Sequence, residues 1–194
     1  MMKNTIIRIV AMLLCVNILS GCMSHPLTEE EMRKLPMYGV SASFVYNIHD
    51  PREAVGICDY VFVGKVISYD GVRYRHPTTE SAGFPYTDYS VQVEDNIKGK
   101  LITNEPIHIV KEGGVTQDGK RIYIYENDEM PETGKKYVFL CYAQSDGSLL
   151  VSGPESNVPV SDDSAVVTRY EDAYKNEIIP ELAEEERYHS VYEE

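Results

Sequence analysis

The sequence predicts a mainly β protein, a small antiparallel barrel or sandwich, from two observations. Residues 89–94 alternate between apolar and polar side chains, as in a half-buried strand, and further short apolar runs follow. Turn dipeptides punctuate them: Asp118-Gly119 and Asp146-Gly147, the second lying between two apolar runs as a β-hairpin requires. Several short strands joined by such turns are typical of small barrels and sandwiches. The further predicted strands span residues 107–110, 122–125, 137–142 and 149–152.

Two predicted elements precede these strands. Residues 50–53 read Asp-Pro-Arg-Glu, which places a capping residue before a proline suited to the first helical position, and the glutamate can complete a capping box. A short N-terminal helix is therefore expected from Asp50 to about Cys58. Residues 59–69 are apolar on both faces, which predicts a central strand with Gly64 as a bulge or bend.

The end of the sequence changes its period. Apolar side chains in 166–182 recur every three or four positions, which predicts an amphipathic C-terminal helix. Asp163 or Ser164 can cap its start, and Pro180 is expected to kink or end it. The remaining residues, 183–194, are rich in glutamate and are expected to form a frayed acidic end.

The start of the sequence has the features of an export signal. Lys3 and Arg8 supply positive charge, and residues 9–19 form an uncharged, mostly apolar core, shorter than the roughly 20 residues that a membrane-spanning helix needs. Residues 19–22 then read Leu-Ser-Gly-Cys, which resembles the lipobox of bacterial type II signal peptides. This resemblance implies that the signal is cut before Cys22 and that the Cys22 thiol carries a diacylglycerol. The alternatives are an ordinary secretion signal that leaves Cys22 free, or an uncleaved helix.

These features divide the chain into four parts. Residues 1–21 are the predicted signal peptide, and 22–43 are polar and charged, as expected of a tether between a lipid and a domain. Residues 44–160 are the predicted barrel, and 161–194 contain the C-terminal helix and the acidic tail. Removing 21 of the 194 residues leaves 173, enough for one ordinary domain and its tails.

The charge of the chain argues against binding to nucleic acid. The formal net charge is −13 and becomes −15 when Lys3 and Arg8 are removed with the signal. A phosphate-binding surface needs clustered lysine and arginine, and the sequence contains no such cluster. Anionic membrane surfaces repel an acidic protein as well, so attachment to a membrane is expected to depend on the lipid at Cys22.

Cysteines and histidines provide no framework for a metal or a disulfide. Two cysteines, Cys58 and Cys141, remain beyond the predicted lipidation site, and we expect two buried thiols in preference to a disulfide. The histidines are scattered, without the short spacings of zinc ligands, so no metal site and no cofactor are predicted. The five histidines are His25, His49, His76, His108 and His189.

Aromatic side chains are the candidate ligand-binding residues. The chain has fifteen tyrosines and no tryptophan, and Tyr123 and Tyr125 fall on one face of a predicted strand. A long predicted loop, 70–87, carries more aromatic residues, and rows of rings can stack on sugars or peptides. The alternative is structural, because tyrosine also favours half-buried strand positions. The five candidates are Tyr74, Phe84, Tyr86, Tyr123 and Tyr125.

Short sequence patterns make the predicted fold more specific. "VFVGKV" at 61–66, "IKG" at 97–99 and "GKKYVFL" at 134–140 resemble small bacterial exported domains with a fold like that of tissue inhibitors of metalloproteases. The resemblance covers about residues 50–159 and implies a small antiparallel OB-like barrel of five to six strands. The animal inhibitors place a free N-terminal cysteine, within a Cys-x-Cys motif, on the protease zinc. Here Ser24 replaces the second cysteine, so zinc-directed inhibition is not implied.

Together these observations predict a lipid-anchored protein on the extracytoplasmic face of the cell membrane. We expect a binding module without catalytic activity. Its predicted partners are the membrane, through the diacylglycerol on Cys22, and an extracytoplasmic protein or glycan, but not nucleic acid. One alternative is an envelope enzyme, which requires a carboxylate beside His49, His76 or His108. The other is a structural component of the envelope.

Overall fold

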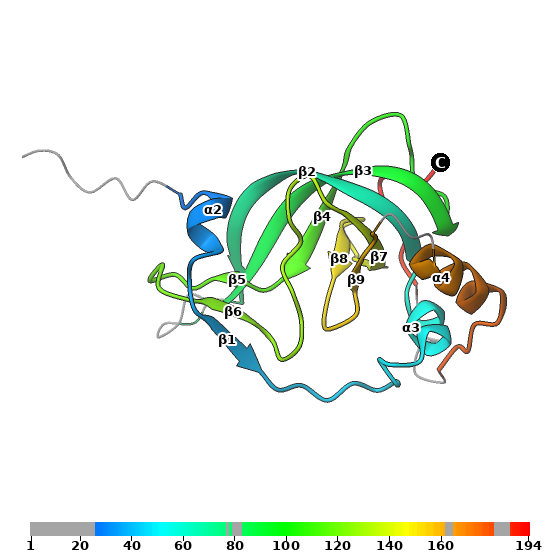
Figure 1. Cartoon of the computed structure of the whole chain (residues 1–194), viewed down its shortest axis with the longest axis horizontal. Coiled ribbons are helices and arrows are strands. Elements are labelled where there is room, and N and C mark those ends of the chain that lie inside the picture. The colour runs from blue at the N-terminus through cyan, green and yellow to red at the C-terminus, as the bar shows by residue number, and fades with distance from the viewer. Residues whose placement is uncertain (1–25, 77, 79–82, 162–164, 181–186) are drawn as a thin grey trace, which may run out of the picture.

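The computed structural model describes residues 26–76, 78, 83–161, 165–180 and 187–194. Its centre is a ring of five strands in the order β2, β3, β4, β8, β7, which the pairing of β7 with β2 closes (Figure 1). The mainly β, OB-like barrel expected from the sequence is therefore confirmed. The ring strands are β2 (Tyr60–Arg75), β3 (Phe84–Lys98), β4 (Ile107–Glu112), β7 (Lys136–Ala143) and β8 (Leu149–Val151).

One junction of the ring is parallel. β4 and β8 run in the same direction, whereas the other four neighbouring pairs are antiparallel. A closed ring with an odd number of strands cannot alternate in direction throughout, so one parallel pair is unavoidable. The hairpin predicted at Asp146-Gly147 joins β7 to β8 and is confirmed. A further short strand, β9 (Asn157–Pro159), pairs with the same edge of β7 as β8 does.

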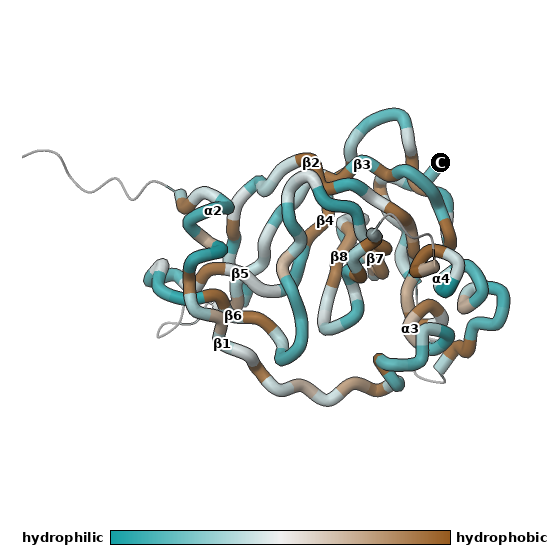
Figure 2. The backbone as a smooth tube through the Cα atoms, viewed as in Figure 1, coloured by the Kyte–Doolittle hydropathy of each residue, from teal (hydrophilic) through white to brown (hydrophobic). Residues whose placement is uncertain are grey.

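Two hydrophobic clusters stabilise the barrel. Alternate side chains of the ring strands fill its interior, where the Phe62 and Phe139 rings lie 5.4 Å apart. The predicted bend occurs at Gly64, where the register with β3 shifts and a Cβ atom would lie 2.6 Å from Val91. The second cluster covers the outside of β2 and β7, where two helices contribute the buried residues Val55 and Tyr170. Hydrophobic stretches of β7 and of these helices are brown in Figure 2.

These helices lie at one end of the molecule (Figure 1). α3 (Pro51–Ile57) begins as predicted, because the Asp50 side chain accepts a hydrogen bond from the Arg52 backbone amide. The Glu53 carboxylate does not complete a capping box; it accepts a hydrogen bond from the Asn47 amide. α4 (Ala165–Lys175) is the predicted C-terminal helix and ends before Pro180. Its proposed caps, residues 163 and 164, lie outside the described residues.

At the opposite end of the molecule, the structure differs from the tether predicted over residues 22–43. Residues 29–40 are folded onto the barrel as α2 (Glu29–Met32) and β1 (Met37–Val40). β1 pairs in parallel with β6 (Ile122–Tyr125), which pairs in turn with β5 (Gly114–Val115). A capping box with Thr28 starts α2, and Met32 is fully buried. The sequence concealed this segment because β1 is mostly exposed and its partner strand lies far away in the chain.

The long loop predicted at 70–87 is also corrected. β2 and β3 continue through most of it as a hairpin, so Tyr74 and Tyr86 lie on strands. Asp70-Gly71 has the composition of a turn, but in the structure both residues lie within β2. The register with β3 shifts between Tyr69 and Gly71, and Gly71 has a φ angle of 120°, which few other residues adopt.

The end of the chain is not frayed over residues 187–194. The Ser190 amide donates a hydrogen bond of 3.0 Å to the Tyr60 hydroxyl, and the Ile102 amide donates one of 2.9 Å to the Tyr192 carbonyl. Glu193 forms an isolated β-bridge with Leu101. The acidic composition predicted an exposed tail, but the segment is held by backbone groups that composition does not reveal.

The structure also places the two thiols. Cys58 and Cys141 are buried and free, as expected, and they belong to different hydrophobic clusters. Burial raises the pKa of the Cys58 thiol to about 12.

Among the residues that the structure describes, no helix is long and apolar enough to cross a membrane.

Candidate aromatic binding site

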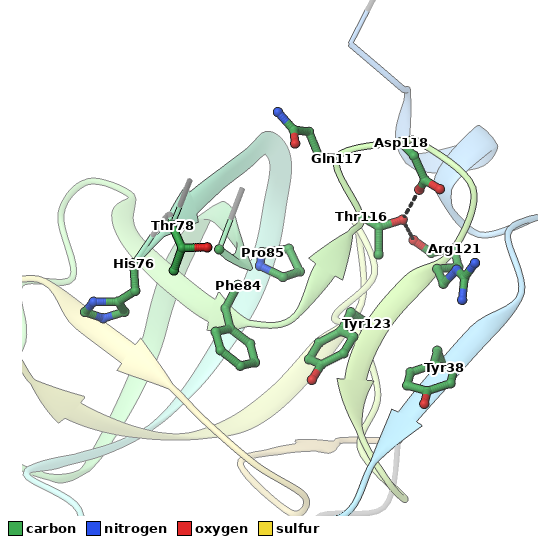
Figure 3. A pocket seen from close by; sticks show the side chains of 11 residues that line it. Tyr38, His76, Thr78, Phe84, Pro85, Thr116, Gln117, Asp118, Arg121 and Tyr123 are labelled. Atoms are coloured by element: carbon green, nitrogen blue, oxygen red, sulfur yellow. Dashed lines mark hydrogen bonds between the residues drawn. The ribbon is translucent and has the colours of Figure 1, made fainter. Parts of the chain in front are cut away.

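A cleft of about 570 Å³ lies where the β1–β6 sheet meets the start of β3. Tyr38, Tyr123 and Phe84 stand in a row along it, each supplied by a different strand (Figure 3). The Tyr38 and Tyr123 rings are stacked, with centroids 6.0 Å apart, and the Phe84 ring meets Tyr123 edge-on at 5.5 Å. The remaining lining residues are His76, Thr78, Gly83, Pro85, Thr116, Gln117, Asp118 and Arg121.

Strand geometry explains this row of rings. In β6, Ile122 and Ile124 are buried, so the alternating residue Tyr123 points to the opposite face. The parallel register places Tyr38 directly beside Tyr123. The side chains of Tyr38 and Phe84 remain 54% and 49% exposed. About half of each ring is thus available to a ligand, while Tyr123 holds both in place.

The rim of the cleft at the β5–β6 turn is polar. The Thr116 hydroxyl lies 2.6 Å from Asp118 Oδ1 and 3.1 Å from the Arg121 carbonyl oxygen. The hydrogen bond from Thr116 lowers the pKa of Asp118, so this carboxylate is charged at neutral pH. Within the described part of the chain, the Arg121 guanidinium forms no ion pair. The cleft therefore combines apolar stacking surfaces with charges of both signs.

A smaller recess adjoins the cleft and contains a carboxylate. It has a volume of about 30 Å³ and shares Phe84, Pro85 and Tyr123 with the cleft. The hydroxyls of Tyr86 and Tyr125 donate hydrogen bonds of 3.3 and 3.2 Å to Glu112 Oε1. The other lining residues of the recess are Val40, Glu112, Gly113, Ile124 and Tyr125.

Two groups around this carboxylate complete the local arrangement. The Ser152 hydroxyl donates a hydrogen bond to the second oxygen, Oε2 of Glu112. Burial, followed by the charge of Glu112, raises the pKa of Tyr125 to about 12, so this phenol keeps its proton at neutral pH. Glu112 is thus surrounded by donors, and the carboxylate is held in one position.

The structure separates the five predicted aromatic residues into two groups. Phe84 and Tyr123 line the cleft, and Tyr125 lines the recess. Tyr86 is buried with its ring beneath the Arg75 guanidinium at 4.9 Å. Tyr74 donates a hydrogen bond of 3.0 Å to the Val115 carbonyl, which links β2 to β5. These last two tyrosines support the site without lining it.

Sequence reasoning missed two residues of this site. Tyr38 lies in the segment assigned to the tether, although the short apolar run at 37–40 is a weak strand signal. Glu112 lies two residues beyond the strand predicted at 107–110, where an acidic residue normally indicates the return to solvent, whereas it ends β4 in the structure. Only the fold shows that three hydroxyls converge on it, from β3, from β6 and from Ser152 directly after β8.

The histidines show one contact with a carboxylate that bears on the enzyme alternative. His108 Nδ1 lies 3.5 Å from Asp70 Oδ2 and 3.4 Å from the Ser90 hydroxyl, which itself lies 2.7 Å from the same carboxylate oxygen. Serine and aspartate thus approach the same ring nitrogen, whereas a catalytic relay uses the two different nitrogens. His49 and His76 form no ion pair with a carboxylate in the part of the chain described.

The acidic, histidine and cysteine side chains do not gather into a metal site in the described part of the chain. No group of three or more histidine, cysteine, aspartate or glutamate side chains is placed to hold a metal ion among the residues described. A comparison with protein-family models finds no match, and a search of curated proteins finds none either. The aromatic cleft and its recess are therefore the features on which a functional proposal rests.

Proposed function

We propose that the protein is a binding module, anchored by a lipid on Cys22 to the extracytoplasmic face of the cell membrane. Its aromatic cleft holds an extracytoplasmic protein or glycan, and its role is not catalytic. The observation that carries this proposal is the row of Tyr38, Tyr123 and Phe84, two of them half-exposed over a cleft of about 570 Å³. Exposed aromatic rings fixed above a concave surface provide contact area at a small cost in conformational entropy.

The anchor and the cleft belong to the same end of the molecule. Only residues 22–28 separate the proposed lipid from the first turn of α2. Seven extended residues span at most about 25 Å. α2 lies beside β1, β5 and β6, which carry the cleft (Figure 1). The proposed anchor thus holds the cleft within a short distance of the membrane, closer than a tether of 22–43 would.

The anchor is tested on the full chain produced in a bacterium that processes lipoproteins. We expect mass spectrometry of the membrane fraction to identify an acylated N-terminal peptide that starts at Cys22. The Cys22→Ala variant is expected to remain an uncleaved precursor or to be released, with Cys58→Ala as the matched control that stays acylated. Normal retention of a cleaved Cys22→Ala protein at the membrane would overturn the anchor.

The cleft is tested with arrays of glycans and extended peptides, probed with the detergent-solubilised full chain. Binding through the cleft predicts a set of array signals that Tyr38→Ser and Tyr123→Ala abolish. Tyr188→Ser is the matched control, because Tyr188 is 44% exposed but does not line the cleft. Signals that all three variants retain would show that the ligand binds elsewhere.

A further inference from the structure

Glu112 is an acidic residue for which the described part of the chain provides no cationic partner. Among the described residues its carboxylate forms no ion pair. The adjacent residue Lys111 faces the other side of β4, where its ammonium contacts both carboxylate oxygens of Asp128 at 2.7 Å. Hydroxyl groups stabilise a carboxylate but do not neutralise it. Glu112 therefore lines a small recess without a cationic partner among the described residues.

The carboxylate also has an unused acceptor position. A carboxylate offers about four lone-pair sites, two on each oxygen. Tyr86 and Tyr125 occupy the two on Oε1, and Ser152 occupies one on Oε2. No other donor of the described residues uses the second site on Oε2. The three donors fix Glu112 in place, so a ligand that uses this site does not have to order the side chain first.

Aromatic residues surround the same recess. Phe84, Tyr123 and Tyr125 line it together with Glu112. The electron-rich faces of such rings attract cations, most strongly where water is excluded. The recess has a volume of about 30 Å³, which is enough for a small polar group of about the size of a water molecule. An ammonium group is of this size, whereas a planar guanidinium is larger.

We propose that this recess binds the primary ammonium of a lysine side chain in an extended peptide that lies along the aromatic cleft. The lysine stem lies against the rings of Phe84 and Tyr123, which line both the cleft and the recess, and its ammonium meets Glu112. This inference rests on the proposed function of the cleft and adds the chemistry of its ligand. A neutral glycan carries no cation for Glu112, and the net charge of −13 favours the approach of a cationic peptide.

The absence of tryptophan from the chain allows a direct measurement. Tyr38→Trp places a unique fluorophore at the mouth of the cleft, outside the recess. Ile67→Trp is the matched control, since Ile67 is 45% exposed on β2 and lines neither cavity. Each full-length, detergent-solubilised protein is titrated with a mixed library of pentapeptides that carry lysine at the centre. Saturable change is expected for Tyr38→Trp and not for Ile67→Trp.

Removal of the charge from either partner tests the role of Glu112. The same library with acetyl-lysine, which keeps the stem and loses the charge, is expected to bind at least about tenfold more weakly. Glu112→Gln in the Tyr38→Trp protein should weaken the lysine library by a similar factor. Glu105→Gln, an exposed position outside the site, should not. The acetyl-lysine arm needs no further mutation, so misfolding of Glu112→Gln does not remove the test.

The outcomes separate this inference from the proposed function. Equal binding of the lysine and acetyl-lysine libraries, or unchanged binding to a folded Glu112→Gln protein, overturns the lysine assignment. If a neutral peptide or a chito-oligosaccharide then changes the Tyr38→Trp fluorescence, the cleft remains a binding site of different chemistry. If no charged or neutral probe changes it up to millimolar concentration, both the assignment and the cleft are overturned.

Discussion

Two neighbouring residues of β4, Lys111 and Glu112, have ionisable side chains in different surroundings. Lys111 is fully buried, and its ammonium lies 2.7 Å from both oxygens of Asp128 and 2.9 Å from the Ser156 hydroxyl. Glu112, on the other face of the strand, borders a cavity, and among the described residues its carboxylate accepts hydrogen bonds from hydroxyl groups alone. The first charge is neutralised by the protein itself, whereas the second is oriented but left open.

This difference indicates which charge is structural. Burial lowers the pKa of Lys111 and raises the pKa of Asp128, and the attraction between them opposes both shifts. Such a pair is costly to form and more costly to break, because one partner alone remains charged in a dry interior. It joins β4 to the segment after β6 and, through Ser156, to the segment before β9. The pair therefore belongs to the architecture, and Glu112 to the site.

The largest expected effect comes from breaking the buried pair. Lys111→Met leaves Asp128 buried without its partner and should reduce the free energy of unfolding by about 3–5 kcal/mol. Urea denaturation followed by circular dichroism measures this. The double variant Lys111→Met/Asp128→Leu should recover much of the loss, and Lys65→Met, at an exposed position of β2, should change little. A loss below about 1 kcal/mol for Lys111→Met would contradict a structural role.

The sequence predicted features that depend on neighbouring residues, but not those that depend on contacts between distant parts of the chain. The start of α3 at Asp50 depends on adjacent residues, and so does the shared face of Tyr123 and Tyr125 in β6. Both follow from spacing alone. A lysine within a strand, by contrast, normally indicates an exposed position, so the burial of Lys111 depends on Asp128 and on the closure of the barrel.

The candidate site shows the same division. Phe84 and Tyr123 were identifiable because one lies in a predicted loop rich in aromatic residues and the other on one face of a predicted strand. Tyr38 was not, because the strand signal at 37–40 is weak and β1 depends on its parallel pairing with the distant strand β6. The recess at Glu112 requires three strands to converge, and no linear pattern encodes such a convergence.

The next prediction concerns the two thiols, which lie in the interior and not in the cleft. Since burial raises the pKa of Cys58 from 9.0 to about 12, its thiolate fraction at neutral pH falls about a thousandfold. Native protein should therefore resist alkylation by iodoacetamide at Cys58 and Cys141, and both should react in 8 M urea. Peptide mass spectrometry measures the labelling. Rapid labelling of either thiol in the folded protein would contradict its burial.

The same shift predicts how stability depends on pH. The pKa of Cys58 is higher in the folded protein than in the unfolded chain, so its contribution is complete below about pH 9 and is lost as the pH rises towards 12. Cys58→Ala should thus show a smaller decline in melting temperature between pH 9 and 11 than the wild-type protein does. An identical decline would assign the alkaline sensitivity to other groups, such as Tyr125.

A smaller effect is expected from Glu112. Glu112→Leu removes the acceptor of three hydroxyls, and its cost should be about 1–3 kcal/mol, below that of Lys111→Met. The hydroxyls of Tyr86, Tyr125 and Ser152 can recover part of this by turning to water that enters from the cleft. Urea denaturation of both variants under one condition gives the order. A larger loss for Glu112→Leu would show that Glu112 is primarily structural.

The smallest effect on stability should come from the cleft itself. Tyr38→Ser and Phe84→Ser remove rings that are already about half exposed, so each should change the free energy of unfolding by about 1 kcal/mol or less. Ile109→Ser, at a fully buried position of β4, is the contrasting control and should be strongly destabilising. A small effect would mean that folding does not require these exposed rings, which is expected of residues that bind a ligand. A large loss in Tyr38→Ser or Phe84→Ser would instead make the row part of the core, and the case for a ligand would lose its physical basis.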